Sequence, residues 1–497
     1  MKTKKKYGLF KILLVILLLV VIATYFVDGR NGSVSYLAFG DVLLNYMQSF
    51  YYFFDTVLFI LAVGGLYGAL NKVDAYKKLV KDIADKMGDN KKLFVVGSTI
   101  VFALLASLTG LDMILLIFVP FIISIILILG YDKLVALSAT IVATLVGYIG
   151  GIFITFKDSS SQYSVTYTTF DKMVGLNGHF GNVFPKILLL VVAVGLLIFY
   201  ILKHIKGIES GDVKVELSQS DVFLVEPRDK KGKKVKVDYS NKKTWPICIL
   251  GGLLLVILVL GFMPWSNLFG LKNFTQFHKW ATELAIPKFK LFGHTFSKYP
   301  IFNSLISSNF TALGEWGSLG TYMMAIIMIA VFLFILKFVS KVKFSDLMDG
   351  FIYGVKKMVP AVMVVMLSYT VLICLSSNGM FETIIPEVMK QAGDNAVVAS
   401  ILAGFGSLLY VDCYYTVASV FSTIVSSLSS KADLSVFAVM FQSIYGLIRI
   451  VGPTSVFLII GLSYLEVPYK SWLKYIWRFV LELLIAIFVV LMIVAMI

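Results

Sequence analysis

The chain has 497 residues, of which 59% are hydrophobic and 15% are charged, and its formal net charge is +15. This composition excludes an ordinary soluble globular protein, because several apolar runs approach the ~20 residues that a membrane-spanning helix needs. The positive charge does not indicate a nucleic-acid partner, since the basic residues fall in short segments between apolar runs, as in cytoplasmic loops. The three cysteines match neither the spacing of a metal site nor that of a disulfide framework.

Lysine clusters and apolar runs predict the topology of the first half. An apolar run at 9–27 follows an N-terminal lysine cluster, which predicts an uncleaved first span with a cytoplasmic N-terminus. A second span at 53–70 returns to a lysine-rich inner loop. Two apolar arms, 93–106 and 113–130, both have their outer ends beside lysines, which predicts a re-entrant hairpin with both ends inside. The remaining predicted spans of this half are 134–156 and 183–202.

A polar, lysine-rich segment divides the chain into two membrane halves. We predict an N-terminal repeat at 1–203, a cytoplasmic basic linker at 204–244 and a C-terminal repeat at 245–497. The second half is predicted to cross the membrane first at 246–262, 319–338 and 358–375. Nine crossings in all place the C-terminus outside, in a multi-pass protein of the cell membrane.

The two halves resemble each other at one constant offset. Phe39-x-Asp41 aligns with Phe344-x-Asp346, and Gly88-Asp89-Asn90 aligns with Gly393-Asp394-Asn395 without a gap between the two matches. The loop that carries this second motif is lysine-rich in the first half and mostly acidic in the second. Loops of opposite charge indicate repeats of opposite orientation, a common plan in secondary transporters. The predicted fold is therefore an all-α polytopic membrane protein with two inverted repeats.

Polar breaks interrupt the apolar sequence at corresponding places in the two halves. One pair is Ser107–Asp112 and Ser407–Asp412, each read as the tip of a re-entrant hairpin. The other pair is Gly147–Gly151 and the stretch from Gly446 to Gly452-Pro453-Thr454-Ser455, each read as a broken helix. Irregular backbone at membrane depth survives only when it is buried in protein or lines a wet cavity. An ionised aspartate there costs about 3 kcal/mol or more unless a cation, a proton or N–H groups neutralise it. We therefore expect a binding site where the breaks meet.

Arg449 lies three residues before Gly452, in a run that is otherwise apolar, and Gln442 adds polarity two turns earlier. A guanidinium at this depth needs a carboxylate, and it is suited to hold that of a substrate through two parallel hydrogen bonds. Three structural interpretations remain open. Asp112 or Asp412 could cap the half-helix that follows it. Arg449 could pair with Asp412 and bind no substrate. Gly147–Gly151 could be a close helix contact and not a break.

The predicted substrate-binding residues are Ser107, Thr109, Asp112, Gly147, Gly150, Gly151, Ser407, Asp412, Gln442, Arg449, Gly452, Pro453, Thr454 and Ser455. We expect no organic cofactor and no structural metal. A coupling ion, either a proton or sodium, has a candidate site near Asp112, Asp412 and Thr454. No histidine lies in a predicted span, and no Gly-x-Ser-x-Gly or His-Glu-x-x-His motif occurs, so an intramembrane enzyme is only a remote alternative, as is a channel.

The C-terminal third resembles the four-carbon dicarboxylate anaerobic carrier family, a branch of the ion transporter superfamily. The resemblance lies in Gly452-Pro453-Thr454-Ser455, Ile460–Leu465 and the motif Val467-Pro468-Tyr469-Lys470-Ser471-Trp472-Leu473-Lys474-Tyr475. Phe344–Pro360 and Gly64–Tyr76 are similar to further segments of that family. The resemblance implies a secondary transporter that works as a homodimer, in which a transport domain moves against a scaffold. It also implies that Thr454, Ser455 and Ser407 contribute to the site.

The sequence departs from the family at two positions of the predicted site. The second hairpin tip ends in Val411-Asp412-Cys413 where the family has small hydroxyl residues, and Gly150-Gly151 replaces a Ser/Thr-Asn-Pro pattern. Lost hydroxyls and a gained carboxylate favour a substrate that bears both signs of charge. The first expectation is thus a carrier or antiporter of an amino acid, with a basic amino acid as one option. The alternative is a dicarboxylate carrier coupled to protons or sodium.

Overall fold

The computed structural model describes residues 8–27, 36–110, 112–152, 182–215, 241–263, 265, 270–300, 312–314, 316, 321–410, 413–429 and 433–496. Within these residues, eight helices are long and apolar enough to cross a membrane, and a ninth span results if the bent pair α2 (Phe39–Tyr52) and α3 (Phe54–Leu70) counts as one. The predicted all-α polytopic membrane fold is confirmed.

In the first half, α1 (Gly8–Phe26) precedes the bent α2–α3 pair, whose two helices meet at an angle of 60°. The further elements are α4 (Asp74–Lys86), η2 (Gly88–Asn90), α5 (Lys91–Thr109), η3 (Met113–Ile117), α6 (Val119–Ile128), α7 (Lys133–Leu137), η4 (Ser138–Val142), α8 (Ala143–Ile149) and α10 (Val183–Glu209). Helix α10 extends past the predicted start of the linker at residue 204, and most of that linker lies outside the described residues.

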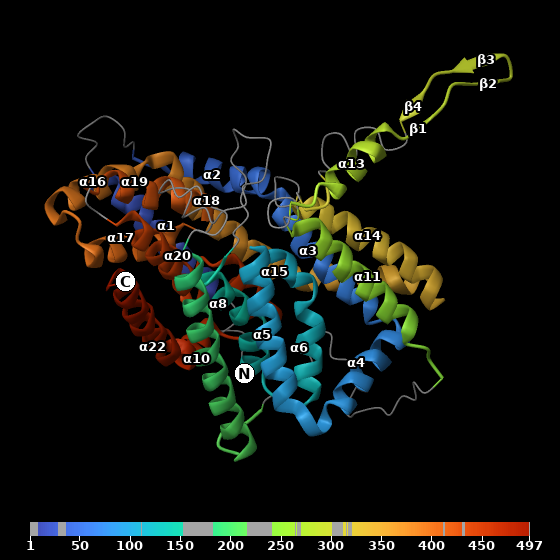
Figure 1. Cartoon of the computed structure of the whole chain (residues 1–497), viewed down its shortest axis with the longest axis horizontal. Coiled ribbons are helices and arrows are strands. Elements are labelled where there is room, and N and C mark those ends of the chain that lie inside the picture. Colours follow the sequence, from blue (N-terminus) through green and yellow to red (C-terminus); the bar gives the residue numbers. More distant parts are fainter. Residues whose placement is uncertain are drawn as a thin grey trace.

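The second half contains α11 (Trp245–Phe262), α13 (Asn273–Glu283), α14 (Thr321–Ser340), α15 (Phe344–Asn378), α16 (Met380–Ala392), α17 (Ala396–Leu409), α18 (Cys413–Thr416), η6 (Val417–Phe421), α19 (Ser422–Ser426), α20 (Leu434–Val451), α21 (Val456–Tyr464) and α22 (Tyr469–Met496). Four short strands form two antiparallel pairs on an arm that projects from the body (Figure 1): β1 (Ala285–Ile286) with β4 (Tyr299–Pro300), and β2 (Phe289–Leu291) with β3 (His294–Phe296).

The repeat predicted from the sequence offset is present in the order of the helices. Helices α15 and α17 begin at Phe344 and Ala396, and their counterparts α2 and α5 begin at Phe39 and Lys91. The helix that precedes each hairpin is α4 in the first half and α16 in the second, and these two lie at opposite ends of the molecule (Figure 1). Opposite placement of corresponding elements is what inverted repeats require.

Both predicted hairpins return to the end from which they start. At the two ends of the first hairpin, Lys92 forms an ion pair with Glu209 at 2.8 Å, and Asp132 accepts a 2.8 Å contact from His204. Since Glu209 and His204 lie at the same end of α10, the α5–η3–α6 segment enters and leaves on one side. The second hairpin is closed by Asp394, which precedes α17 and accepts a 2.7 Å hydrogen bond from the backbone N–H of Ser429, just after α19.

A close antiparallel crossing of α3 and α15 joins the two repeats. A Cβ atom placed on Gly68 would lie 2.1 Å from the carbonyl oxygen of Gly350, and one on Gly354 would lie 2.0 Å from that of Gly64. Only glycine permits this approach, which is the small-residue packing typical of membrane helices. The same antiparallel register continues along α2, where Ser49 receives a 3.4 Å hydrogen bond from Thr370.

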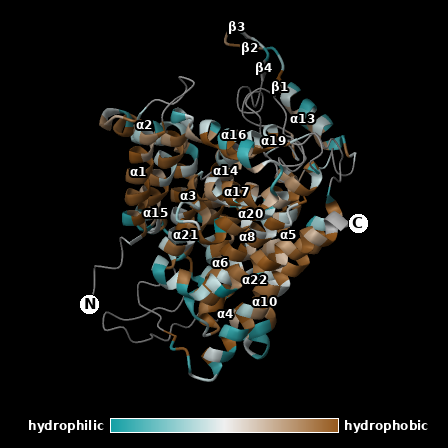
Figure 2. Cartoon of the chain, turned by 90° about the vertical axis from the view of Figure 1, so that its left-hand side faces the viewer, coloured by the Kyte–Doolittle hydropathy of each residue, from teal (hydrophilic) through white to brown (hydrophobic). Residues whose placement is uncertain are grey.

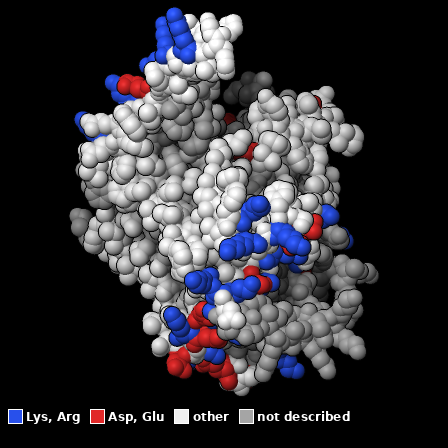
Figure 3. All heavy atoms as spheres, turned by 90° about the vertical axis from the view of Figure 1, so that its right-hand side faces the viewer, with Lys and Arg blue, Asp and Glu red and all other residues white. Residues whose placement is uncertain are grey.

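The distribution of polar residues defines the membrane-facing part of the molecule. Hydrophobic residues dominate the middle, and hydrophilic residues gather toward the two ends (Figure 2). On the face shown in Figure 3, lysines, arginines and acidic residues gather in the lower part, with a further basic group at the tip of the upper arm. A wide uncharged belt between two charged ends is the surface that a bilayer requires.

Candidate functional site

The tip of the first hairpin is bonded to the first break. Helix α5 ends at Thr109, and Gly110 follows in the left-handed conformation (φ 66°) that favours glycine after a helix. The hydroxyl of Ser107 donates a 2.8 Å hydrogen bond to the carbonyl of Gly150, and the backbone N–H of Ile152 donates a 3.0 Å bond to the carbonyl of Ser107. These bonds satisfy backbone groups that the end of α8 at Ile149 leaves without helical partners.

The second hairpin and the second break meet in the same way. Helix α20 ends at Val451, and α21 resumes at Val456, so Gly452, Pro453, Thr454 and Ser455 form a true interruption. Thr454 donates a 2.6 Å hydrogen bond from its hydroxyl to the carbonyl of Leu408, near the end of α17. In the first repeat, the hydroxyl that joins hairpin and break belongs to Ser107 of the hairpin. In the second repeat, it belongs to Thr454 of the break.

The C-terminal motif closes the carbonyl end of α20. The hydroxyl of Tyr469 donates to the carbonyl of Val451, and the indole N–H of Trp472 donates a 3.0 Å hydrogen bond to the carbonyl of Ile450. These two carbonyls belong to the last turn of α20, which has no intrahelical donors. The tyrosine and tryptophan of the Pro-Tyr-x-x-Trp segment therefore hold the broken helix open at a fixed place.

Arg449 lies between the two repeats, and its partner is Asp112. The guanidinium Nη2 donates to the carboxylate Oδ2 of Asp112, the tip residue of the first hairpin. The rings of Tyr148 and Tyr445 also lie against the guanidinium, with centroids 5.2 and 5.5 Å from Cζ, so that both contribute cation–π attraction. Arg449 is 8% exposed, and its Nε has no hydrogen-bond partner among the described residues. The guanidinium therefore has an N–H group that can donate a hydrogen bond to a further acceptor.

Asp112 serves two functions at once. Its Oδ1 accepts a 2.6 Å hydrogen bond from the backbone N–H of Met113, which caps η3, while Oδ2 holds Arg449. The capping interpretation of Asp112 is therefore realised, together with an ion pair. The pair between Arg449 and Asp412 that the sequence left open involves a residue outside the described part of the chain.

Gln442 connects the second repeat to the first break. Its side-chain amide donates a 2.8 Å hydrogen bond to the carbonyl of Gly151, with longer contacts of 3.3 Å to the carbonyls of Tyr148 and Ile149. The amide oxygen of Gln442 has no partner within the described residues. One side chain of α20 thus satisfies the end of α8.

The other predicted residues divide into three groups. Gly147 lies within α8, where a Cβ atom would be 2.2 Å from the carbonyl oxygen of Ala103, so the close-contact interpretation holds for this residue and the break itself begins at Gly150. The hydroxyls of Thr109 and Ser407 turn back onto carbonyls of their own helices. Ser455 is buried, and its hydroxyl has no partner among the described residues.

The sequence analysis missed Tyr148 and Tyr445, which contact the guanidinium of Arg449, and it did not predict that Lys186, whose backbone carbonyl lies close to Gly150, is buried. The two tyrosines lack a sequence signal because an aromatic residue in an apolar run is ordinary. Lys186 is buried (1% exposed) near the start of α10. A lysine at the start of a span usually extends to the interface, so burial of this side chain is not predicted by its place in the sequence.

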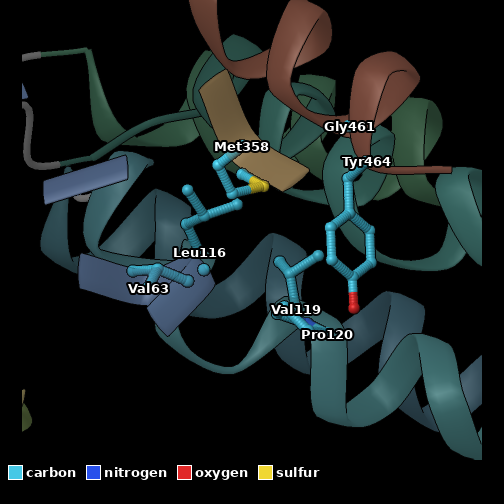
Figure 4. Close-up of a pocket in the computed structure, with 8 residues that line it drawn as sticks. Val63, Leu116, Val119, Pro120, Met358, Gly461 and Tyr464 are labelled. Atoms are coloured by element: carbon cyan, nitrogen blue, oxygen red, sulfur yellow. The ribbon is translucent and has the colours of Figure 1, made fainter. Parts of the chain in front are cut away.

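A small apolar cavity has none of these charged residues in its lining, which comes from helices of both repeats (Figure 4). Its lining includes Val63 of α3, Met358 of α15, Leu116 of η3 and Tyr464 of α21. Apolar walls offer no hydrogen bond to a carboxylate, so this cavity does not suit the recognition of one.

Within the described residues, no three His, Cys, Asp or Glu side chains are grouped as a metal ion requires. Near the candidate cation site, Asp112 is engaged by Arg449 and the hydroxyl of Thr454 by Leu408, whereas Asp412 lies outside the described part.

Two solved structures match the chain at low sequence identity. The YdaH transporter of Alcanivorax borkumensis shares 12% identity over 97% of this chain and 96% of its own, with a TM-score of 0.37. MtrF of Neisseria gonorrhoeae, described as one of a class of antimetabolite efflux pumps, shares 12% identity over 97% of this chain and 94% of its own, with a TM-score of 0.39. No curated protein matches the sequence.

The comparison with protein families gives a match over nearly the whole chain. Residues 47–496 match the family described as C4-dicarboxylate anaerobic carrier. This range includes both hairpins, both breaks and the C-terminal motif that caps α20. The chain is a multi-pass membrane transporter that belongs to the C4-dicarboxylate anaerobic carrier family.

Proposed function

We propose that the protein is a secondary active carrier of four-carbon dicarboxylates, and that the substrate binds where the hairpin tips meet the breaks. The observation that carries this proposal is the buried guanidinium of Arg449, which keeps an unused Nε donor beside both breaks. A guanidinium binds a carboxylate through two parallel hydrogen bonds. Family membership favours this substrate over the amino acid that the departures in the sequence placed first.

Asp112 supplies the coupling step in this proposal. A substrate carboxylate that approaches Arg449 competes with Oδ2 of Asp112. Once displaced, an ionised Asp112 beside a dianion would be strongly repelled in a medium of low dielectric. Uptake of a proton by Asp112 removes this repulsion, while the neutral acid still accepts the N–H of Met113. Substrate binding and proton uptake are therefore linked, and a proton is the coupling ion we favour over sodium.

During transport, one part of the molecule is proposed to move against another part that stays fixed. The hairpins and broken helices form the moving body, and the glycine crossing of α3 and α15 forms the scaffold within a homodimer. The cavity of Figure 4 lies along the boundary, since α3 and α15 of the scaffold and η3 and α21 of the moving body all contribute to its lining. A disulfide between Val63→Cys and Leu116→Cys should stop transport reversibly, with Val63→Cys alone as the control. Transport by the fully cross-linked protein would contradict the moving body.

We also propose the orientation that the lysines indicate, with the N-terminus and the linker in the cytoplasm and the C-terminus outside, in the cell membrane. In a cysteine-free background, Ser210→Cys at the end of α10 and Phe292→Cys at the tip of the arm should react with an impermeant reagent from opposite sides. Phe292 is 92% exposed, so access does not limit its labelling. Labelling from one side only would contradict the inverted arrangement.

Counterflow in liposomes tests the substrate. Purified protein in liposomes loaded with unlabelled succinate should accumulate labelled succinate transiently, faster at lower external pH. External four-carbon dicarboxylates should compete, and arginine should not. Protein-free liposomes are the control. Competition by arginine in place of succinate would instead favour the amino-acid carrier, and a non-saturable flux without counterflow would indicate a channel.

A further inference from the structure

The lysines of the C-terminal motif take no part in closing the end of α20. Tyr469 and Trp472 of that motif bond to carbonyls of α20. Lys470 and Lys474 are instead exposed at the start of α22. Arg478 is also exposed and continues the row at the same interval of four residues. Residues four apart share one face of a helix, so three positive charges lie along one side of α22.

The cations of this row are not paired with acidic side chains. Among the described residues, none of Lys470, Lys474 and Arg478 forms an ion pair with a carboxylate. Like charges at this spacing repel each other and lower the stability of a helix. Arg478 lies over the ring of Trp477, with 5.3 Å between Cζ and the ring centroid, but this contact does not neutralise its charge. The row therefore favours an anion from outside the chain.

Helix α10 brings a further cation to this part of α22. The two helices lie side by side (Figure 2), and they meet along a seam where the ring of Tyr200 is 6.0 Å from that of Phe479. The ammonium of Lys203 lies 5.9 and 5.8 Å from the ring centroids of Phe199 and Tyr200, so these rings hold it near the seam. Lys203 is exposed, and within the described part of the chain it forms no ion pair with a carboxylate.

Glu482 ties the two helices together at this seam. It follows Arg478 in the row on α22, and its carboxylate accepts a 2.5 Å hydrogen bond from the hydroxyl of Tyr200 on α10. The row on α22 and the helix that carries Lys203 are therefore joined by a direct contact. The four cations outnumber this acid, so the seam keeps an excess of positive charge.

The same side of α22 becomes apolar beyond this row. Leu481, Ile485 and Val489 are exposed, again at intervals of four residues. Lys203 lies six residues before the end of α10, or about 9 Å along the helix axis, which is close to the depth of lipid headgroups. Trp477 is exposed beside the row, as aromatic residues at a membrane boundary are. A charged row that leads into an apolar one has the polarity of a phospholipid.

We infer that the seam of α10 and α22 is a binding site for one anionic phospholipid. The phosphate lies against Lys203, Lys474 and Arg478, and one acyl chain follows Leu481 and Ile485. Basic pockets between membrane helices suit anionic headgroups. The bound lipid stabilises α22, whose first turn closes the end of α20. The inference depends neither on the transported substrate nor on which end of the protein is cytoplasmic.

The test compares phosphatidylglycerol with phosphatidylcholine around the full-length protein. Nanodiscs of phosphatidylcholine receive increasing fractions of phosphatidylglycerol, and a rise in the melting temperature of the protein reports binding. The unmodified protein should show this rise. The seam variant, which combines Lys203→Gln, Lys474→Gln and Arg478→Gln, should show almost none. Each cation near an anionic lipid surface contributes about fivefold in affinity, so the three together contribute about a hundredfold.

The matched control removes the same charge from exposed lysines on other elements, through Lys81→Gln, Lys86→Gln and Lys343→Gln. This variant should keep the full response to phosphatidylglycerol. A rise that survives in the seam variant would overturn the inference. An equal loss in both variants would also overturn it, because that result indicates attraction to the membrane surface as a whole.

Two further measurements complete the test. If the seam variant does not fold, Arg478→Gln alone should weaken the response about fivefold, and an unchanged response would overturn the inference. Glycerol phosphate, which has the phosphate ester without acyl chains, should not raise the melting temperature of the detergent-solubilised protein. A rise with glycerol phosphate equal to that with the lipid would assign the seam to a soluble phosphate ester and overturn the lipid.

Discussion

Two regions of the molecule, the glycine crossing and the region of the hairpin tips and breaks, are held together by opposite kinds of group. Helices α3 and α15 meet backbone to backbone at Gly68 and Gly350. The hairpin tips and breaks meet through hydroxyls, a carboxylate and a guanidinium, as at Thr454 and Arg449. A backbone crossing at this distance admits no substitute, whereas a hydrogen bond to a carbonyl can be exchanged for one to water or to a ligand. The glycine crossing is therefore suited to hold the two repeats together, whereas the hydrogen-bonded contacts at the tips and breaks are suited to open.

A bulky residue at the glycine crossing should have the largest effect. Gly68→Leu places a Cβ atom 2.1 Å from the carbonyl oxygen of Gly350, so the helices must separate. We expect a loss of about 3 kcal/mol or more in the free energy of unfolding, and little monodisperse protein. Gly251→Leu on α11, where no atom lies within 4 Å of the new Cβ, is the control. An unchanged melting temperature for Gly68→Leu would contradict the scaffold role.

Removal of one member of the Asp112–Arg449 ion pair should have the next largest effect on stability. Arg449→Met leaves Asp112, whose side chain is only 20% exposed, without its cation. The loss of one partner from a largely enclosed ion pair costs up to about 3–5 kcal/mol, and a joint replacement with Asp112→Leu should recover much of it. Uptake of labelled succinate separates the two roles of the pair. Stability should return in the double variant and transport should not. Restored transport would remove both residues from the substrate site.

Asp112→Asn tests the role of the carboxylate charge with a smaller expected loss of stability. The amide oxygen still accepts the N–H of Met113, so the cap of η3 is kept and the loss of stability should be below that of Arg449→Met. Counterflow should continue, but its rate should no longer rise as the external pH falls, because the group that takes up the proton is gone. An unchanged pH response would assign proton coupling to another group.

Loss of the hydroxyls that join each hairpin to the break of the same repeat should give the smallest effects. Ser107→Ala and Thr454→Val each leave one buried carbonyl without its donor, and each should cost about 1 kcal/mol of stability. Ser407→Ala is the control, because its hydroxyl only bonds to Ala403 of the same helix. A larger effect of Ser407→Ala than of Thr454→Val on melting temperature would show that the contacts are assigned to the wrong side chains.

Much of the fold could be predicted because it depends on local patterns and on a repeat. The match of Gly88-Asp89-Asn90 with Gly393-Asp394-Asn395 located the start of each hairpin correctly. The two copies nevertheless differ: Asn395 caps α17 through bonds to the N–H groups of Val397 and Val398, whereas Asn90 forms no such side-chain cap. The sequence motif thus locates the start of each helix, and the side-chain contacts of the folded chain determine how that start is capped.

The partners within the site could not be predicted in the same way. Asp112 and Asp412 are equivalent in the repeat, so sequence alone gives no reason for Arg449 to choose Asp112. The contact of Tyr148 and Tyr445 with the guanidinium depends on the crossing of α8 and α20, which no local pattern reports. Lys186 has the sequence environment of an interfacial lysine, and only the packing of α10 against Gly150 places it inside.

The separation of 337 residues between Asp112 and Arg449 has a consequence for biosynthesis. The first hairpin leaves the ribosome long before its cation exists, and an ionised aspartate cannot wait in lipid without a large cost. The nascent hairpin must therefore remain near the membrane surface, or keep Asp112 protonated, until α20 has been made. We therefore expect the first hairpin to reach its final depth only after the second repeat is complete, when Arg449 becomes available to Asp112.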